Sequence, residues 1–349
     1  MLDPRLIPYS TSPHEEWIRL PLDRTEPPVP YRTSVMPPLN TPSRYPSPGE
    51  LEAILASNFN RAPEEVIVTA GADEALDRAC RALLNDQSQV IITNPSFEML
   101  RHYALLARAT VEEVEWLDAQ FPFEEICARV TPETRMIALI SPNNPTGRAI
   151  PVKEIERLAS LYPRIVILLD LAYVEFAKHD PTRQLLEFEN ILIVRTFSKA
   201  WGLPGLRLGY AIGQSQLIGW LRTAGGPYSV ARASIEMIAN NIEEWRPSMN
   251  EYVKRIQWER QRLSAILDER NIRFIPSESN FILLFPEDPL LFDRTLQTFG
   301  IRTRSFENNP LISSARRMTL PGDPKVFEQL EQAFEQAAYT LQYTSISIP

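Results

Sequence analysis

The chain has 349 residues, of which 44% are hydrophobic and 23% are charged, and its formal net charge at pH 7 is -8. A chain of this length can bury a large core and is long enough for two domains. An acidic balance without a basic cluster argues against nucleic acid as the main partner, and because no run of 18 or more apolar residues occurs, we expect a soluble protein without a membrane partner.

The N-terminal residues and the cysteines bear on the compartment. Residues 1–12 lack the basic and apolar segments of a signal peptide. Cys80 and Cys127 have no Cys-x-x-Cys spacing, so we expect reduced thiols and a cytoplasmic protein. His14, His102 and His179 are scattered without the spacing of metal ligands, so no metal site is expected.

Residues 1–46 are rich in proline, with seven prolines between Pro27 and Pro46. Proline fixes φ and removes a backbone donor. The sequence therefore predicts an extended N-terminal arm that lies over another part of the molecule.

From residue 47 to residue 246, short apolar segments alternate with helical patterns. Helices are expected at 49–59 and 72–84. Strands are expected at 66–69, 90–93, 110–116, 136–140, 165–170, 191–195 and 208–212. This alternation predicts a large α/β domain whose mainly parallel sheet is covered by helices on both faces.

After about residue 213 the pattern changes to long helices, at 235–245 and 250–269. Shorter pieces close the chain: strands near 281–285 and 317–320, and helices near 290–299 and 324–339. We expect a smaller α+β C-terminal domain over residues 247–349, joined by the N-terminal arm.

Lys199 lies on the loop that follows the expected strand at 191–195. The chain has five lysines, although Lys and Arg together number 36, and Lys199 alone stands among apolar and small neighbours. In an open α/β sheet the carboxyl ends of the strands line the ligand cleft. There, burial and a cation such as Arg207 would lower the pKa of an amine and suit it to imine chemistry. A surface turn with a solvated Arg207 explains the same residues, and the pattern alone leaves both interpretations open.

Three further strand ends should meet at the same edge of the sheet. The turn from Thr69 to Glu74 contains Gly71 and opens a helix, whose free N–H groups favour an anion. The loop at 141–147 would place the Asn144 amide in the cleft, where it can donate without adding charge. Ordinary turns explain these two features equally well. Asp170 ends the most apolar strand, and a partly buried acid there needs a cationic partner.

Three motifs occur together in one order: Asn144-Pro-Thr-Gly, Asp170-x-x-Tyr173, and Ser198-x-Lys199 followed by Arg207. They resemble the pyridoxal-phosphate aminotransferases of class I and II, which have fold type I. The segment from Arg195 to Tyr210 is most similar to the histidinol-phosphate aminotransferase subgroup, and the resemblance extends over about residues 44–322. It implies a large domain with a mainly parallel sheet, a smaller α+β C-terminal domain, and pyridoxal 5'-phosphate as the cofactor.

The resemblance also implies roles for single residues. Lys199 is the Schiff-base lysine and general base, Asp170 is the partner of the pyridine nitrogen, and Tyr173 contacts the ring hydroxyl together with Asn144. Phe97 stacks on the ring. The residues implied at the phosphate are Gly71, Ala72, Asp73, Thr196, Ser198 and Arg207.

Three more residues are implied outside these motifs. Tyr45 resembles the tyrosine that reaches the phosphate of the neighbouring subunit, which implies a homodimer with shared sites. Arg317 and Arg304 resemble arginines that bind a carboxylate or phosphate of the substrate. The resemblance therefore implies a small-molecule substrate, either an amino acid or a phosphorylated amine.

One departure from the subgroup bears on the substrate. The subgroup commonly has Asn-Glu-Asn-Pro near the substrate, and this chain has Thr25-Glu26-Pro27-Pro28. We expect Glu26 to face the distal end of the substrate and to select a cation such as a guanidinium. The motifs do not specify the fate of the substrate carbanion. Transamination is the leading hypothesis, and three alternatives stay open: elimination with ring closure (a cyclase or dehydratase), decarboxylation of an arginine-like amino acid, and a relative that only binds a ligand.

Overall fold

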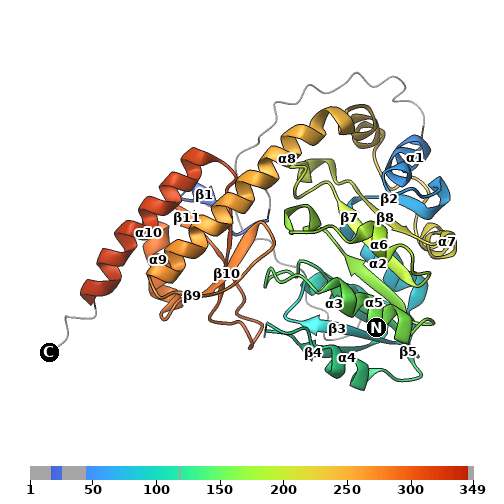
Figure 1. Ribbon diagram of the computed structural model, residues 1–349, viewed down its shortest axis with the longest axis horizontal. Helices are drawn as coiled ribbons and strands as arrows, with labels where there is room; N and C mark the ends of the chain where they lie inside the picture. Colours follow the sequence, from blue (N-terminus) through green and yellow to red (C-terminus); the bar gives the residue numbers. More distant parts are fainter. Residues whose placement is uncertain (1–16, 26–44, 118, 345–349) are drawn as a thin grey trace.

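A seven-stranded sheet organises the larger part of the protein (Figure 1). The computed structural model describes residues 17–25, 45–117 and 119–344, with side chains described as far as residue 335. The strands are β2 (Val66–Thr69), β3 (Gln89–Asn94), β4 (Thr110–Glu115), β5 (Thr134–Ile140), β6 (Val166–Asp170), β7 (Ile191–Thr196) and β8 (Gly209–Gly213). Their order is β2-β8-β7-β6-β5-β3-β4, and β8 is antiparallel to both neighbours whereas the other pairs are parallel. The predicted mainly parallel sheet is confirmed, and each predicted strand end lies within two residues of the observed one.

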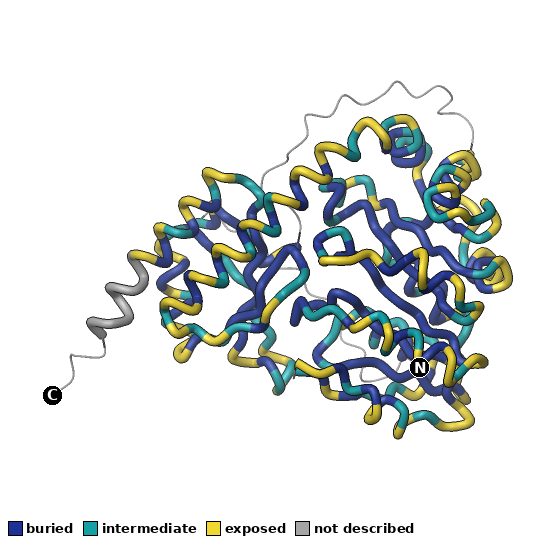
Figure 2. The backbone as a smooth tube through the Cα atoms, in the orientation of Figure 1, coloured by how far each residue is buried: buried dark blue, intermediate teal, exposed yellow. Residues whose placement is uncertain are grey.

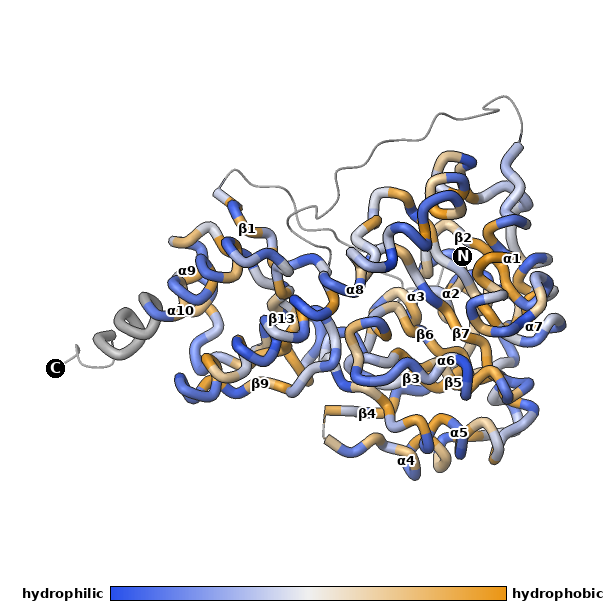
Figure 3. The backbone as a smooth tube through the Cα atoms, turned by 45° about the horizontal axis from the view of Figure 1, so that its top comes forward, coloured by the Kyte–Doolittle hydropathy of each residue, from blue (hydrophilic) through white to orange (hydrophobic). Residues whose placement is uncertain are grey.

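Helices cover both faces of this sheet, which is why central strands such as β6 are buried along their whole length, whereas the edge strand β4 is mostly polar and less buried. Leu168 of β6 packs in a cluster with residues of α2 (Gly71–Leu83), α3 (Glu98–Leu106) and α7 (Ser215–Thr223). Its neighbour Leu169 points to the opposite cluster. The helices on that side are α1 (Gly49–Ser57), α4 (Phe123–Arg129), α5 (Val152–Leu161) and α6 (Thr182–Leu185). Figure 2 shows the strands buried between these layers, and Figure 3 shows hydrophobic segments gathered along strands such as β6 and β7.

The smaller part is built on a four-stranded antiparallel sheet with the order β12-β13-β10-β9. Its strands are β9 (Arg273–Ile275), β10 (Phe281–Phe285), β12 (Arg304–Ser305) and β13 (Arg316–Thr319). The helices α9 (Pro289–Thr298) and α10 (Pro324–Thr344) pack beside it. From the N-terminal arm, β1 (Leu20–Pro21) pairs in parallel with β11 (Ile301–Arg302). Short 3₁₀ turns lie at Pro63–Glu65, Val174–Phe176 and Pro204–Leu206.

A single helix, α8 (Arg232–Glu269), connects the two parts (Figure 1). The two helices predicted at 235–245 and 250–269 are wrong, because the structure has one helix of 38 residues with Pro247 inside it. Proline removes one helical hydrogen bond, but buried residues on both sides, such as Ile242 and Met249, keep the helix packed on the core. The domain boundary predicted at residue 247 falls within α8, and the division into 1–46, 47–246 and 247–349 stays a prediction.

None of the helices in the described part of the chain has both the length and the apolar character that a membrane span requires.

Candidate active site

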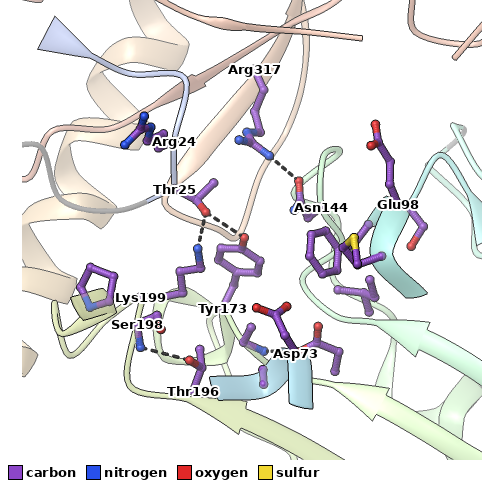
Figure 4. A pocket seen from close by; sticks show the side chains of 18 of the residues that line it. Arg24, Thr25, Asp73, Glu98, Asn144, Tyr173, Thr196, Ser198, Lys199 and Arg317 are labelled. Carbon is purple, nitrogen blue, oxygen red and sulfur yellow. Dashed lines mark hydrogen bonds between the residues drawn. The ribbon is translucent and has the colours of Figure 1, made fainter. Parts of the chain in front are cut away.

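The carboxyl ends of the parallel strands face a cavity of about 610 Å³, which the four-stranded sheet closes from the other side. The cavity contains most of the residues that the sequence predicts for the site. Its predicted lining residues are Ala72, Asp73, Phe97, Asn144, Asp170, Tyr173, Thr196, Ser198, Lys199, Arg207, Arg304 and Arg317. Segments far apart in the sequence therefore meet at one place, as Figure 4 shows.

Lys199 lies just past the end of β7 and is half-buried. Its Nζ donates a hydrogen bond of 2.5 Å to Oγ1 of Thr25, and it lies 5.5 Å from the centre of the Tyr173 ring. The same Thr25 oxygen is 3.1 Å from the Tyr173 hydroxyl. The amine is thus held by a hydroxyl inside the cavity and does not extend into bulk water (Figure 4).

Asp170 is the last residue of β6, and its side chain is buried in the wall of the cavity. Burial raises the pKa of this carboxyl to about 7, because the charged form loses its water; the Asp73 carboxylate adds to the rise, whereas a hydrogen bond from the Ala172 amide and the Lys199 charge oppose it. The Ala172 N–H donates to Oδ1 at 2.9 Å. A cationic donor placed in the cavity would favour the ionised carboxylate.

The start of α2 has features of an anion site. Gly71 has φ +79, a left-handed conformation that glycine adopts without strain, and it turns the chain from β2 into the helix. The first N–H groups of a helix have no partner within it and favour a negative group. Arg207 donates a hydrogen bond of 3.1 Å to Asp73 at the same place, so its guanidinium lies next to the helix start.

Two hydroxyl residues, Thr196 at the end of β7 and Ser198 in the loop after it, add to this candidate anion site. Thr196 and Ser198 line the cavity, and the Ser198 N–H donates to Oγ1 of Thr196 at 3.1 Å. Hydroxyl groups can both donate and accept. The helix start, one guanidinium and two hydroxyl residues therefore form a cradle suited to a phosphate.

The opposite wall of the cavity carries two arginines from the four-stranded sheet. Arg317 of β13 is buried, and its Nη1 donates to Oδ1 of Asn144 at 2.6 Å while its Nη2 donates to the Asp23 carbonyl at 2.9 Å. Arg304 of β12 is its partner in the strand register. Because a guanidinium binds carboxylates and phosphates through two parallel hydrogen bonds, this wall can bind a negative group of a ligand.

One predicted site residue, Tyr45, lies away from this cavity. Tyr45 is 76% exposed, does not line the cavity of its own chain, and stacks on Tyr228 with ring centres 4.3 Å apart. Glu26 lies outside the described residues, so its predicted role stays a prediction. Gly71 is not in the wall itself but forms the turn that places Ala72 and Asp73 there.

The sequence did not identify several residues of the cavity as site residues. Asp23, Arg24 and Thr25 reach it from the N-terminal arm, and Tyr103 and Phe306 reach it from α3 and the loop after β12. The arm residues carry no periodic pattern, so their contacts depend on tertiary structure. One sign in the sequence indicated that Thr25 belongs to the site: it begins the segment Thr25-Glu26-Pro27-Pro28, where the histidinol-phosphate aminotransferase subgroup commonly has Asn-Glu-Asn-Pro.

Comparisons with known proteins agree with this geometry. The family model for aminotransferase class I and II matches residues 36–334. Histidinol-phosphate aminotransferase 2 of Bacillus cereus is 32% identical over 299 residues, covering 83% of this chain and 80% of that protein. Histidinol-phosphate aminotransferase 1 of Bacillus anthracis is 31% identical over 240 residues, which are 67% of this chain, and the chain spans 65% of the length of that relative.

Two solved structures share the fold. The putative histidinol-phosphate aminotransferase of Erwinia carotovora atroseptica superposes with a TM-score of 0.79 at 23% identity, covering 91% of this chain and 95% of that one. Histidinol-phosphate aminotransferase of Sinorhizobium meliloti, solved in complex with pyridoxal-5'-phosphate, also gives 0.79, at 20% identity over 93% of this chain and 92% of that one.

Proposed function

Since the chain belongs to the aminotransferase class I and II family and has fold type I, we propose that it is a pyridoxal 5'-phosphate-dependent aminotransferase. The observation that carries this proposal is that a half-buried lysine, a buried carboxyl and a phosphate cradle lie together in one cavity. These are Lys199, Asp170 and the start of α2 with Arg207.

The cavity fits this cofactor at three points. The aldehyde requires an amine, which Lys199 offers; the ring nitrogen requires an acid, which Asp170 offers; and the phosphate requires an anion site, which the start of α2 offers. The raised pKa of Asp170, caused by burial, supports the second point, because a buried carboxyl gains most from a cationic donor such as a protonated ring nitrogen. Asn144 and Tyr173 would bind the ring hydroxyl, and Phe97 would pack on the ring. When bound, pyridoxal phosphate supplies an electron sink for the negative charge that develops at the substrate Cα.

The residues of the chain then have separate tasks. Lys199 would hold the cofactor before the substrate arrives, and afterwards its free amine would take up the Cα proton as general base and give a proton back as general acid. Asp170, as a carboxylate, keeps the ring nitrogen protonated. Arg317 binds the substrate's negative group in a bidentate contact and so fixes Cα within reach of the Lys199 amine.

We propose that the substrate is an amino acid or a phosphorylated amine that carries a negative group. Arg317 and Arg304 support this, because both line the wall opposite Asp170. The relatives described above are named histidinol-phosphate aminotransferases, so a substrate of the histidinol phosphate type is the first to test. These names favour transamination over elimination with ring closure, over decarboxylation and over a role in ligand binding alone.

We also propose a homodimer. Tyr45 supports it, since its side chain is exposed, stacks on the exposed Tyr228 and does not line the cavity of its own chain. The free thiols of Cys80 and Cys127 fit a reducing compartment, and we propose the cytoplasm.

The test is to incubate the holoenzyme with amino acids and phosphorylated amines, including histidinol phosphate, with and without a 2-oxo acid. The proposal predicts that the carbonyl product exceeds one equivalent per active site only when the 2-oxo acid is present, and that the 2-oxo acid is itself converted to an amino acid. A product lighter by one water, or released carbon dioxide, in the absence of the 2-oxo acid would contradict transamination.

A further inference from the structure

Four consecutive residues of the N-terminal arm are fixed over the cavity through their backbone carbonyls. Thr319 donates twice: its backbone N–H binds the Leu22 carbonyl (2.9 Å), and its Oγ1 binds the Arg24 carbonyl (2.5 Å). Arg317 Nη2 donates to the Asp23 carbonyl (2.9 Å), and Asn280 Nδ2 donates to the Thr25 carbonyl (3.3 Å). Thr319 and Asn280 are completely buried. Residues 22–25 therefore have a defined position, although β1 is only two residues long.

This attachment places the Thr25 side chain between two groups of the site. Its Oγ1 accepts a hydrogen bond of 2.5 Å from Lys199 Nζ and lies 3.1 Å from the Tyr173 hydroxyl (Figure 4). Thr25 and Tyr173 are only 8% and 4% exposed, so the contact is shielded from water. A hydroxyl has one proton and two lone pairs, so it can serve the amine and the phenol together.

The contact matters in the state in which the Lys199 amine is free. A free lysine side chain has four rotatable bonds, so it loses much conformational entropy when its amine is held in one direction. A threonine is stiff at χ1, so a hydroxyl on a fixed backbone holds the amine in a defined direction. The segment that carries Thr25 also binds Arg317 through the Asp23 carbonyl, so the amine and the anion-binding arginine are positioned by one piece of chain.

We propose that Thr25 is a positioning residue: its hydroxyl holds the free amine of Lys199 and links it to the Tyr173 hydroxyl, so that the amine is oriented for proton transfer. The proposal rests on the proposed function of this cavity. It predicts that the hydroxyl, and not the volume of the side chain, is what the site requires at position 25.

The first experiment uses the cofactor-free full chain and needs no activity. The variants are Thr25→Val, which keeps the shape without the hydroxyl, Thr25→Ser, which keeps the hydroxyl, and Thr25→Ala as a second variant without it. A water-soluble amine reagent is applied at fixed pH, and the labelling of Lys199 is followed by peptide mass spectrometry. Because the hydrogen bond that holds the Lys199 amine is lost, labelling should become about tenfold faster in Thr25→Val and Thr25→Ala and stay near the wild-type rate in Thr25→Ser.

The second experiment measures transamination by the holoenzyme variants, with substrate carrying hydrogen or deuterium at Cα. Thr25→Val should lower kcat about 10- to 100-fold with little change in KM, should increase the deuterium effect, and should be rescued by Thr25→Ser. A purely structural role would not produce this isotope effect or this split between kcat and KM.

The outcomes separate this proposal from the proposed function. Labelling that does not respond to Thr25→Val and Thr25→Ala overturns the role of Thr25, even where the wild type transaminates. Equal losses in Thr25→Ser and Thr25→Val overturn it as well. Labelling that responds as predicted, in a protein that does not transaminate, supports the contact between Thr25 and Lys199 and contradicts the proposed function instead.

Discussion

Arg317 donates a hydrogen bond of 2.6 Å to Asn144, and this bond joins the four-stranded sheet to the loop that follows β5 of the seven-stranded sheet. Both side chains are buried in the wall of the cavity. The guanidinium is therefore oriented before any ligand arrives. A site whose binding groups are already placed loses less entropy when it binds its ligand.

Arg317→Gln should raise KM for an anionic substrate by about 10- to 100-fold, because a charged bidentate contact is lost. The matched control is Arg316→Gln. Arg316 is the neighbour on β13, is also buried, and forms an ion pair with Asp293 at 2.7 Å. Neighbouring residues of a strand point to opposite faces, so Arg316→Gln should lower the thermal stability and leave KM unchanged. Steady-state kinetics and thermal melts check both, and equal KM effects would contradict the role of Arg317.

Gly71→Ala should weaken cofactor binding about tenfold, because alanine at φ +79 is strained by about 1–2 kcal/mol and its Cβ would lie 2.8 Å from Arg207 Nη2. Gly205→Ala is the control, since a Cβ there meets no atom within 4 Å among the described residues. Titration of the cofactor-free protein with pyridoxal phosphate measures both dissociation constants. An unchanged constant in Gly71→Ala would show that the phosphate does not bind at this turn.

Tyr45→Phe should also weaken cofactor binding, by about three- to tenfold, because one hydrogen bond from the second subunit to the phosphate is lost. Tyr228→Phe removes the hydroxyl of the stacking partner and should leave the affinity unchanged. Sedimentation velocity should show a dimer in all three proteins. A monomeric wild type that binds the cofactor fully would contradict the shared site.

The contribution of Asp170 to the stability of the cofactor-free protein should fall as pH rises toward neutrality. The pKa of Asp170 is raised by burial to about 7 from an ordinary value of 3.8, so between these values the folded state holds a proton that the unfolded state releases. The stability that Asp170 contributes is fully present below its unfolded-state pKa of 3.8 and is lost as pH rises through its folded-state pKa of about 7. At pH 8 Asp170→Asn should therefore be more stable than the wild type, by about 4 kcal/mol, and at pH 4 about equal to it.

Denaturant unfolding at the two pH values measures this difference, and Glu259 is the control. Burial also raises the pKa of Glu259 to about 7, but Glu259 lies on α8 and does not line the cavity. Pyridoxal phosphate should abolish the pH dependence that Asp170 contributes and leave that of Glu259 in place. A cofactor without effect on the Asp170 contribution would mean that this carboxyl is not its partner.

Most strands of the large sheet could be predicted because they are short apolar runs buried on both faces, as β6 is. The continuous helix through Pro247 could not be predicted. Proline usually ends or kinks a helix, but here packing on both sides of Pro247 outweighs that preference. Asp170 and Lys199 were predictable because each directly follows or ends a strand whose carboxyl end must face the cavity. Thr25 was not, since its contact with Lys199 spans 174 residues and depends on four backbone bonds to other elements.

The most direct measurement of the central claim is to treat the holoenzyme with borohydride, digest it, and locate the bound cofactor by mass spectrometry. The chain has only five lysines, so the assignment is unambiguous. The account predicts the pyridoxyl group on Lys199 and none in Lys199→Ala. A cofactor found on Lys153, Lys178, Lys254 or Lys325 in place of Lys199, or none bound to the wild-type chain, would contradict it.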